Sequence, residues 1–261
     1  MSNKGQAIGF LGYGTIASAL LQGSAKSQLD QGHCLMVSER SESRSLEIVQ
    51  AYPAIKRLPN QDLLDASDVI VLGTTADQAR ELLPQLDLKP GQRVISLMAR
   101  IDAHELQGLI APAQFDTNLI PFPVASYGQC PLLCAPASSL AQDLFGGSQH
   151  VIGLENQSQM HKFLCAQALL SPLLQQLHDT TQWLGEQTGE PQKAESFLRA
   201  LVGRSLSAAP LDQPGVLAQM LEDLSTPGGY NATLRDHLDQ SGAYRSLVEG
   251  LDRLDRDNAP G

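Results

Sequence analysis

The chain has 261 residues, of which 42% are hydrophobic and 18% are charged, and its formal net charge at pH 7 is −10. This length predicts one large domain or two modest ones, and the acidic balance argues against nucleic acid or an anionic membrane as the main partner, because both would repel the protein. No apolar stretch approaches the roughly 20 residues that span a bilayer and no secretory signal is visible, so we expect a cytoplasmic protein.

The first part of the chain alternates short apolar runs with stretches of helical spacing. This alternation predicts βαβ units and a parallel sheet. We expect strands at residues 6–11, 34–37, 68–72, 94–97, 115–120, 132–134 and 150–154, the last ones antiparallel or mixed at one edge. We expect helices at residues 15–26, 77–83 and 103–109, and another that includes Leu46 and Val49.

After about residue 155 no β-branched run survives, and Leu, Ala and Gln dominate residues 157–186. Gly189 ends one predicted helix and Pro191 begins the next, and further helices are expected at 192–208, 214–224, 229–240 and 243–256. The sequence therefore predicts an α/β Rossmann domain with a doubly wound, mostly parallel sheet over residues 1–154. An all-helical domain follows over residues 155–261.

The first strand runs into "GYGTIA", in which Gly12, Gly14 and Ala17 fit the dinucleotide-binding fingerprint G-x-G-x-x-G/A. The first glycine permits a tight turn, the second lets a pyrophosphate approach the backbone, and the small third residue lets helix and strand pack closely. The motif follows a strand and opens a helix, which is the context that it requires. We expect cofactor contacts from Gly12, Tyr13, Gly14, Thr15, Ile16 and Ala17.

The end of the second strand reads "VSERSESR", residues 37–44. An acidic residue there binds the ribose hydroxyls of NAD, whereas basic and hydroxyl residues hold the extra phosphate of NADP. Glu39 therefore argues for NAD, while Ser38, Arg40, Ser41 and Arg44 argue for NADP. We favour NADP and keep NAD as the alternative.

Cysteines and histidines form no recognisable metal or redox motif in the sequence. Cys130 and Cys134 are the nearest pair, and their spacing is not that of zinc or redox pairs. We expect four free thiols, buried or half-buried, and no metal. His104, His161 and His178 could act as acids, but positions on helix surfaces are the simpler interpretation.

Four segments together resemble the pyrroline-5-carboxylate reductases: "IGFLGYGTIASALLQG", "DASDVIVLGT", "GQRVISLMARI" and above all "LEDLSTPGGYNATLRDHL". The resemblance implies a Rossmann domain, a helical domain that interlocks with a second copy, and reduction of a cyclic imine to proline by NADPH or NADH. It implies further cofactor contacts in the turns after later strands, at Gly73, Thr74, Thr75, Met98, Ala99 and Pro121. It places Thr226, Gly228 and Gly229 near the substrate.

The sequence departs from that family at several motifs, most clearly where substrate binds. The family's Val-Lys-Pro turn is Thr74–Ala76 here, its Ala-Ala-Gly turn is Met98–Arg100, and its Pro-Asn-Thr-Pro segment is Pro121–Val124. Its Ser-Gly-Ser-Gly-Pro segment is "ALLSP", which leaves Ser171 beside Pro172. Two threonines of the family are Tyr230 and Asn231. Cofactor binding thus carries over better than substrate binding, and proline biosynthesis is the default rather than a requirement.

Several side chains are candidates for contact with an imine or its carboxylate. Thr226 offers a hydroxyl, Pro227 is expected in a first helical turn, and Gly228 and Gly229 offer N–H groups. Ser171 is a second hydroxyl, and Pro172 suggests a helix break or start. Arg100 could clamp a carboxylate or form a surface salt bridge. Tyr230 and Asn231 could bind a ring nitrogen or only pack.

Two other functions fit parts of the sequence. Hydroxyacid dehydrogenases share this architecture, but Lys162 lacks the glycine pair and the asparagine that accompany their catalytic lysine. A catalytically inactive nucleotide-binding sensor or scaffold would show an intact "GYGTIA" with altered substrate motifs. We expect a small imine or amino-acid-like substrate and a homodimer formed through the helical domain.

Overall fold

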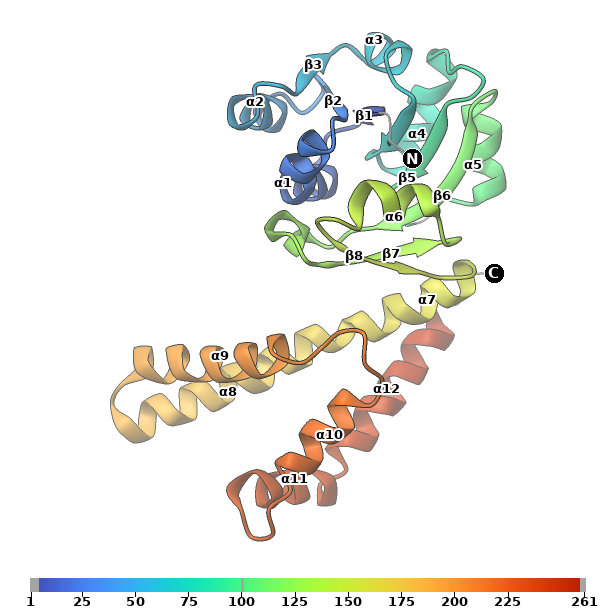
Figure 1. Ribbon diagram of the computed structural model, residues 1–261. Coiled ribbons are helices and arrows are strands. Elements are labelled where there is room, and N and C mark those ends of the chain that lie inside the picture. The colour runs from blue at the N-terminus through green and yellow to red at the C-terminus, as the bar shows by residue number, and fades with distance from the viewer. Residues whose placement is uncertain (1–4, 100, 259–261) are drawn as a thin grey trace. The chain divides into compact units, whose positions relative to one another are not determined.

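The computed structural model describes residues 5–99 and 101–258, and the chain divides into two compact units, Met1–Met160 and His161–Gly261 (Figure 1). The predicted boundary after residue 154 follows the last strand, and helix α7 (Gln157–Ala166) runs across the division. Within the described residues, no helix combines the length and the apolar character that a bilayer crossing needs.

The first unit is built on one eight-stranded sheet in the order β3-β2-β1-β4-β5-β6-β7-β8. The first six strands pair in parallel, the seventh is antiparallel to the sixth, and the eighth is parallel to the seventh. The order 3-2-1-4-5-6 is that of a doubly wound dinucleotide-binding fold, so the predicted fold class is confirmed. The strands are β1 (Ala7–Leu11), β2 (Cys34–Ser38), β3 (Lys56–Leu58), β4 (Val69–Leu72), β5 (Arg93–Ser96), β6 (Gln114–Ile120), β7 (Pro131–Ala135) and β8 (His150–Gly153).

An apolar layer covers each face of this sheet, so its central strands are buried on both faces. Strand β4 is Val-Ile-Val-Leu with every residue buried, as a strand covered on both sides requires. One core cluster joins Phe10 to side chains of α1, α2 and α6, and the other joins Leu11 to side chains of α3, α4 and α5. The helices of this unit are α1 (Thr15–Asp30), α2 (Glu42–Ala51), α3 (Asn60–Asp65), α4 (Ala76–Leu82), α5 (Ala103–Ile110) and α6 (Ser139–Phe145).

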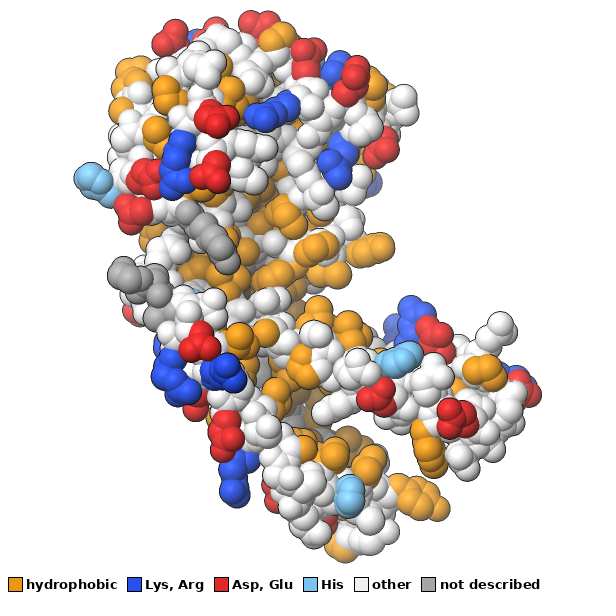
Figure 2. Space-filling view, turned by 180° about the vertical axis from the view of Figure 1, so that it is seen from behind, with side chains coloured by type: hydrophobic (Ala, Val, Ile, Leu, Met, Phe, Trp, Pro, Cys, Tyr) orange, Lys and Arg blue, Asp and Glu red, His pale blue; other side chains and the backbone are white. Residues whose placement is uncertain are grey.

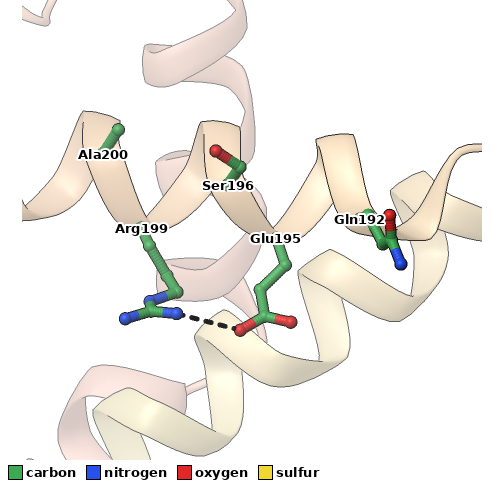
Figure 3. A pocket seen from close by; sticks show the side chains of 5 residues that line it. All are labelled: Gln192, Glu195, Ser196, Arg199 and Ala200. Atoms are coloured by element: carbon green, nitrogen blue, oxygen red, sulfur yellow. Dashed lines mark hydrogen bonds and ion pairs between the residues drawn. The ribbon is translucent and has the colours of Figure 1, made fainter.

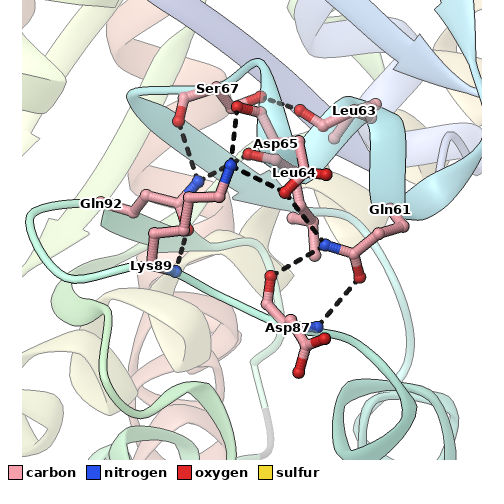
Figure 4. A network of polar contacts seen from close by, with 8 residues as sticks. All are labelled: Gln61, Leu63, Leu64, Asp65, Ser67, Asp87, Lys89 and Gln92. Carbon is pink, nitrogen blue, oxygen red and sulfur yellow. Dashed lines mark hydrogen bonds and ion pairs between the residues drawn. The ribbon is translucent and has the colours of Figure 1, made fainter.

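A polar network fastens α3 to the segment before β5, at the edge where the parallel strands begin (Figure 4). The buried amide of Gln92 donates to the carbonyls of Leu64 and Ser67 over 2.6 and 2.9 Å. Gln61 exchanges two hydrogen bonds of 3.0 Å with the backbone of Asp87. This network pairs the polar groups of the loops, and it lies at the sheet edge opposite to the strand ends that carry the glycine-rich turn.

All four cysteines are free. Cys134 is buried and Cys130 and Cys165 are half-buried, as expected, but Cys34 is exposed. The expectation for Cys34 is wrong because this residue is the first of β2 and lies at the surface, and the buried part of the strand begins at Leu35.

The second unit consists of helices only. Helices α8 (Leu170–Thr188) and α9 (Pro191–Ser207) form a hairpin in which Gly189, with φ +72°, ends the first helix and Pro191 begins the second. Gly185 lets the two helices approach closely, since a Cβ there would lie 3.1 Å from Cα of Pro191. The remaining helices are α10 (Val216–Asp223), α11 (Tyr230–Gln240) and α12 (Ala243–Asp257).

Candidate functional site

The glycine-rich turn lies where β1 ends and α1 begins, beside the end of β4. Gly12 has φ +83°, and a Cβ there would lie 2.5 Å from Cγ2 of Thr74. A Cβ on Gly73 would lie 2.2 Å from the carbonyl oxygen of Gly12 and 2.6 Å from Cβ of Ala17. The fold itself therefore requires glycine at positions 12 and 73 and a small residue at position 17, because the turn and the neighbouring strand end touch backbone to backbone.

Gly14 differs from these residues, since no packing inside the protein demands its lack of a side chain. Its backbone has φ −79° and ψ −171°, which any residue adopts. A Cβ there would meet only the carbonyl oxygen of Gly73, at the ordinary distance of 3.7 Å. The space beside Gly14 is open, and a glycine there keeps the backbone accessible from outside the protein.

The N-terminus of α1 faces this space without a capping side chain among the described residues. Gly14 is the N-cap, and the first turn carries no acidic residue. The N–H groups of the first turn have no partner inside a helix, and the helix dipole adds a partial positive charge there. Thr15, Ile16 and Ala17 thus supply a ready anion site.

Tyr13 and Ser38, both expected at the cofactor, have buried side chains. The Tyr13 ring belongs to the apolar core, its phenol oxygen has no hydrogen-bond partner among the described residues, and burial raises its pKa. The Ser38 hydroxyl accepts the backbone N–H of Gly12 over 3.0 Å. Ser38 therefore supports the glycine-rich turn from the interior through this hydrogen bond. The Tyr13 and Ser38 side chains both lie inside the protein.

Charged residues of both signs surround the end of β2. Glu39 and Arg40 are exposed there. Arg57 of β3, a residue that the sequence analysis did not single out, donates to the carbonyl of Glu39 over 3.4 Å and to Oγ of Ser45 over 3.0 Å. Its guanidinium also lies 3.8 Å from the Glu39 carboxylate and 3.9 Å from that of Glu42. Parallel pairing of β2 with β3 brings this cation to the site.

A cleft of about 540 Å³ opens at the ends of β4 and β5. Thr74 and Met98, predicted from separate turns, both line it and contact each other, with Oγ1 of Thr74 3.7 Å from the Met98 sulfur. Thr75 caps α4 through its hydroxyl, which accepts the N–H of Gln78. The cleft is lined by Thr74, Thr75, Ala76, Asp77, Arg80, Leu97, Met98 and Ala99.

The rim of this cleft is held by an ion pair that the sequence analysis missed. Arg80 of α4 contacts Glu105 of α5 over 2.6 Å and Asp77 over 2.7 Å. The Arg80 guanidinium holds the pKa of the Glu105 carboxyl below its usual value.

Pro121 is buried directly after β6, at the same edge of the sheet. Arg100, the expected carboxylate clamp, lies outside the described residues.

In the second unit the Thr226–Gly229 segment forms a turn before α11. Gly228 has φ +73°, and the N–H of Gly229 donates to the carbonyl of Thr226 over 2.9 Å. The helix begins at Tyr230 with Gly229 as its N-cap, so the expectation that Pro227 lies in a first helical turn is wrong. Proline and a positive-φ glycine at the centre of a turn explain the difference.

Arg235 fixes this turn from inside α11. Its guanidinium donates to the Leu221 carbonyl over 3.0 Å and to Oγ of Ser225 over 2.7 Å. The N-terminus of α11 has neither a side-chain cap nor an acidic first turn within the described chain. Tyr230 and Asn231 are both exposed, and the tyrosine side chain is 97% exposed.

Ser171 lies in the first turn of α8, in a different hollow of the second unit. Pro172 falls at the third position of this helix, after a single 3₁₀ turn at Gln167–Leu169. The hollow has a volume of about 550 Å³ and includes His178, two turns further along the same helix. Another polar hollow lies on α9 beside one ion pair, Glu195 with Arg199 at 3.2 Å (Figure 3), and has the character of a solvated helix surface.

Residues 7–100 match the family described as "NADP oxidoreductase coenzyme F420-dependent". Comparison with curated protein sequences gives no match. Among solved structures, the pyrroline-5-carboxylate reductase of Coxiella burnetii is 18% identical, with 95% of this chain and 96% of that chain covered and a TM-score of 0.77. The Plasmodium falciparum pyrroline carboxylate reductase with NADP bound is 15% identical, with 98% and 97% covered and a TM-score of 0.73.

A reductive aminase from Aspergillus terreus in complex with NADPH and ethyl levulinate is 16% identical, with 96% and 91% covered and a TM-score of 0.54. The predicted resemblance to pyrroline-5-carboxylate reductases is thus confirmed in the fold of the whole chain. That fold is shared with reductases that carry NADP or NADPH in their structures.

Proposed function

We propose that the protein is an NADPH-dependent reductase of a carbon–nitrogen double bond, with a cyclic imine of the pyrroline-5-carboxylate type as its substrate. The observation that carries this proposal is the open backbone at Gly14 beside the uncapped N-terminus of α1. In open α/β sheets, ligands bind at the carboxyl ends of the strands where the strand order reverses. Here β1 lies between β2 and β4, which is that point.

The residues at this edge fit a dinucleotide from one end to the other. The N–H groups of Thr15, Ile16 and Ala17 would hold the pyrophosphate against the bare backbone of Gly14. The end of β2 would hold the ribose, with Arg40 and Arg57 supplying positive charge for the 2′-phosphate of NADP. Glu39 would instead bind the ribose hydroxyls of NAD, and its proximity to Arg57 reduces its negative field.

The cleft at the ends of β4 and β5 would receive the reactive ring of the cofactor. A bound nicotinamide dinucleotide supplies the hydride for reduction of a C=N bond. The protein has to orient the two partners and exclude water. Met98 and Leu97 give the cleft an apolar wall, while Thr74 and Thr75 give it hydroxyl groups.

Substrate contacts are proposed for the helical unit. The N–H groups at the start of α11, after Gly228 and Gly229, are suited to a substrate carboxylate, because this helix end lacks its own acidic or hydroxyl cap in the described chain. The Thr226 hydroxyl would hydrogen-bond the imine nitrogen or the carboxylate. Ser171 is the second candidate hydroxyl. Tyr230 and Asn231, both exposed, would contact the substrate only where another surface covers them.

A second copy of the chain is the proposed cover for the helical unit. Among the described residues of its helices, only Thr181, Gly185 and Ala194 are buried. Figure 2 shows hydrophobic side chains exposed over these helices. A monomer rarely leaves this much apolar surface in water, and we expect a homodimer in sedimentation equilibrium. The exposed large hydrophobic side chains of these helices include Leu170, Trp183, Phe197, Leu201, Leu217 and Leu234.

The hydroxyacid dehydrogenase alternative requires Lys162 as a proton donor. Instead the Lys162 ammonium is bonded to the carboxylate of Asp255 within the helical unit. A lysine fixed in an ion pair is poorly suited to donate its proton to a developing alkoxide. This ion pair supports the proposed imine chemistry over alcohol chemistry.

The deciding experiment measures NADPH oxidation by absorbance against a panel of cyclic imines and 2-keto acids, together with cofactor-induced thermal shift. We expect a shift with NADPH and turnover on a cyclic imine that carries a carboxylate. A thermal shift without turnover on any compound would indicate the sensor or scaffold instead. Absence of any heat of binding for reduced and oxidised dinucleotides at millimolar concentration would overturn the cofactor site itself.

A further inference from the structure

Three metal-ligating side chains converge in the helical unit, apart from the residues discussed so far as a reductase site. His161 and Cys165 lie one turn apart on α7, and Asp255 comes from α12. Nε2 of His161 is 3.6 Å from the Cys165 sulfur, 3.2 Å from Oδ1 of Asp255 and also 3.2 Å from the backbone carbonyl oxygen of Asp255. The three ligand atoms all lie within 4.8 Å of one another.

The two separations from Nε2 of His161 match edges of a tetrahedron around a zinc-sized ion. Zinc bonds of about 2.0–2.1 Å to nitrogen or oxygen and about 2.3 Å to sulfur, at tetrahedral angles, place nitrogen and sulfur about 3.5 Å apart. The same geometry places nitrogen and oxygen about 3.3 Å apart. The ligand atoms therefore need only small movements to hold the ion.

The surroundings of the carboxylate also suit a metal ligand. Oδ2 of Asp255 accepts a hydrogen bond from the Lys162 ammonium. Oδ1 is buried and has no hydrogen-bond partner among the described residues, and it faces His161. A lysine on the far oxygen is an outer partner of the kind that orients a ligating carboxylate and balances its charge.

A cysteine–histidine–aspartate catalytic triad is a poorer interpretation of the same residues. In a triad the nucleophile contacts one ring nitrogen and the carboxylate orients the other. Here Cys165 and Asp255 both face Nε2 of His161. Convergence on a single point is the arrangement of metal ligands.

We propose that His161, Cys165 and Asp255 form a binding site for a divalent transition-metal ion of the zinc class, with the fourth position open to water. Binding would release the thiol proton of Cys165, since the thiolate is the ligand. The neutral imidazole would bind through Nε2 with its proton on Nδ1. The ion would join the first helix of the unit to its last, and would stabilise the folded chain by mass action.

The test uses the full-length protein, freed of metal by a chelator, kept reduced with a phosphine and titrated with Co²⁺ and then Zn²⁺. We expect one Co²⁺ per chain, a thiolate-to-cobalt charge-transfer band, its loss when Zn²⁺ displaces the cobalt, and a rise in Tm with Zn²⁺ that chelator reverses. Cys165→Ser and His161→Gln should abolish the band. The matched controls Cys34→Ser, at an exposed cysteine of the other unit, and His178→Gln, on α8, should keep it.

Two further variants separate the site from a structural role of the same residues. Asp255→Asn keeps the size of the side chain and should weaken Co²⁺ binding, while Lys162→Gln should retain the band with roughly 10- to 100-fold weaker affinity. Circular dichroism establishes that each variant is folded. No charge-transfer band in the wild-type protein, or a band of equal strength in Cys165→Ser, would overturn the proposal. Neither result bears on NADPH binding, which is measured separately.

Discussion

The backbone N–H of Gly12 donates a hydrogen bond of 3.0 Å to Oγ of Ser38, inside the first unit. The Ser38 side chain is fully buried at the end of β2. The contact joins the glycine-rich turn to the neighbouring strand, and the Ser38 side chain, expected from the sequence to touch the cofactor, is engaged inside the protein. This arrangement makes the shape of the turn depend on a hydroxyl that solvent does not reach.

Ser38→Ala is expected to destabilise the protein and to weaken dinucleotide binding together. The substitution leaves the Gly12 N–H buried without a partner, which costs about 1–3 kcal/mol. Urea unfolding measures the first effect and calorimetry with NADPH the second. Ser43→Ala, at an exposed position of α2, is the matched control and should change neither. Unchanged stability in Ser38→Ala would show that the turn does not depend on this hydrogen bond.

Gly14→Ala should separate cofactor binding from stability. The site has an ordinary backbone conformation and open space for a Cβ. The variant is therefore expected to fold with a stability change of about 1 kcal/mol or less, because alanine is a poorer N-cap than glycine but loses less backbone entropy on folding. A methyl group beside the N-terminus of α1 would keep a pyrophosphate from the backbone, and we expect NADPH affinity to fall by about 10-fold or more, a loss of about 1.4 kcal/mol.

Gly108→Ala is the control for this variant, because Gly108 lies on α5 in open space and its replacement should leave NADPH binding intact. Gly12→Ala should instead lose stability, since φ +83° and the 2.5 Å approach to Thr74 both disfavour a side chain. Full NADPH affinity in Gly14→Ala would contradict the proposed pyrophosphate site.

The strands of the first unit could be predicted well because burial on both faces leaves a strong signal. The runs at 68–72 and 94–97 are continuous and apolar, and each predicted strand boundary lies within one residue of the observed one. Strand β3 was not predicted, since Lys-Arg-Leu at a sheet edge carries no such pattern. Helices α3 and α6, of six and seven residues, were also missed.

From the pattern of residues alone, the candidate site could be predicted where it lies in one continuous motif, whereas Thr74 and Met98 came from the resemblance to the reductases. Gly12, Gly14 and Ala17 were identified because strand, turn and helix are consecutive. Arg57 was missed because its place beside Glu39 follows from the pairing of β2 with β3, which the sequence does not show. His161 and Cys165 have a helical ligand spacing, but their partner comes from the C-terminal helix.

Arg40 is expected to select NADPH over NADH. Its exposed side chain follows β2, and a charge-assisted bond to the 2′-phosphate of NADP would be worth about 1.5–3 kcal/mol. Arg40→Ala should raise KM for NADPH by roughly 10-fold and leave KM for NADH unchanged. Lys56→Ala, which removes an exposed cation from β3, is the control. Glu39→Gln should have the opposite effect: it should raise KM for NADH and leave KM for NADPH unchanged. If Glu39→Gln weakens cofactor binding and Arg40→Ala does not, the protein uses NAD.

His33 should make the stability of the first unit depend on pH. Burial lowers its pKa, and its Nδ1 accepts the N–H of Gln6 over 3.0 Å while Nε2 lies 3.3 Å from Oε1 of Gln31. Both contacts suit the neutral ring, whereas the unfolded chain takes up a proton below about pH 6.5. The unfolded state then binds more protons, so the free energy of unfolding should fall as pH drops below that value, until the lower folded pKa is passed.

Urea unfolding at a series of pH values between about 7 and 5, the range in which an ordinary histidine titrates, measures this dependence. His33→Gln should flatten it relative to the wild-type protein. His104→Gln, at an exposed position of α5, should leave it in place, because that ring is not enclosed. Carboxylates held by cations, such as Asp65 beside Lys89, contribute only at lower pH, where their protonation begins. An identical pH profile for His33→Gln and the wild type would contradict the assignment.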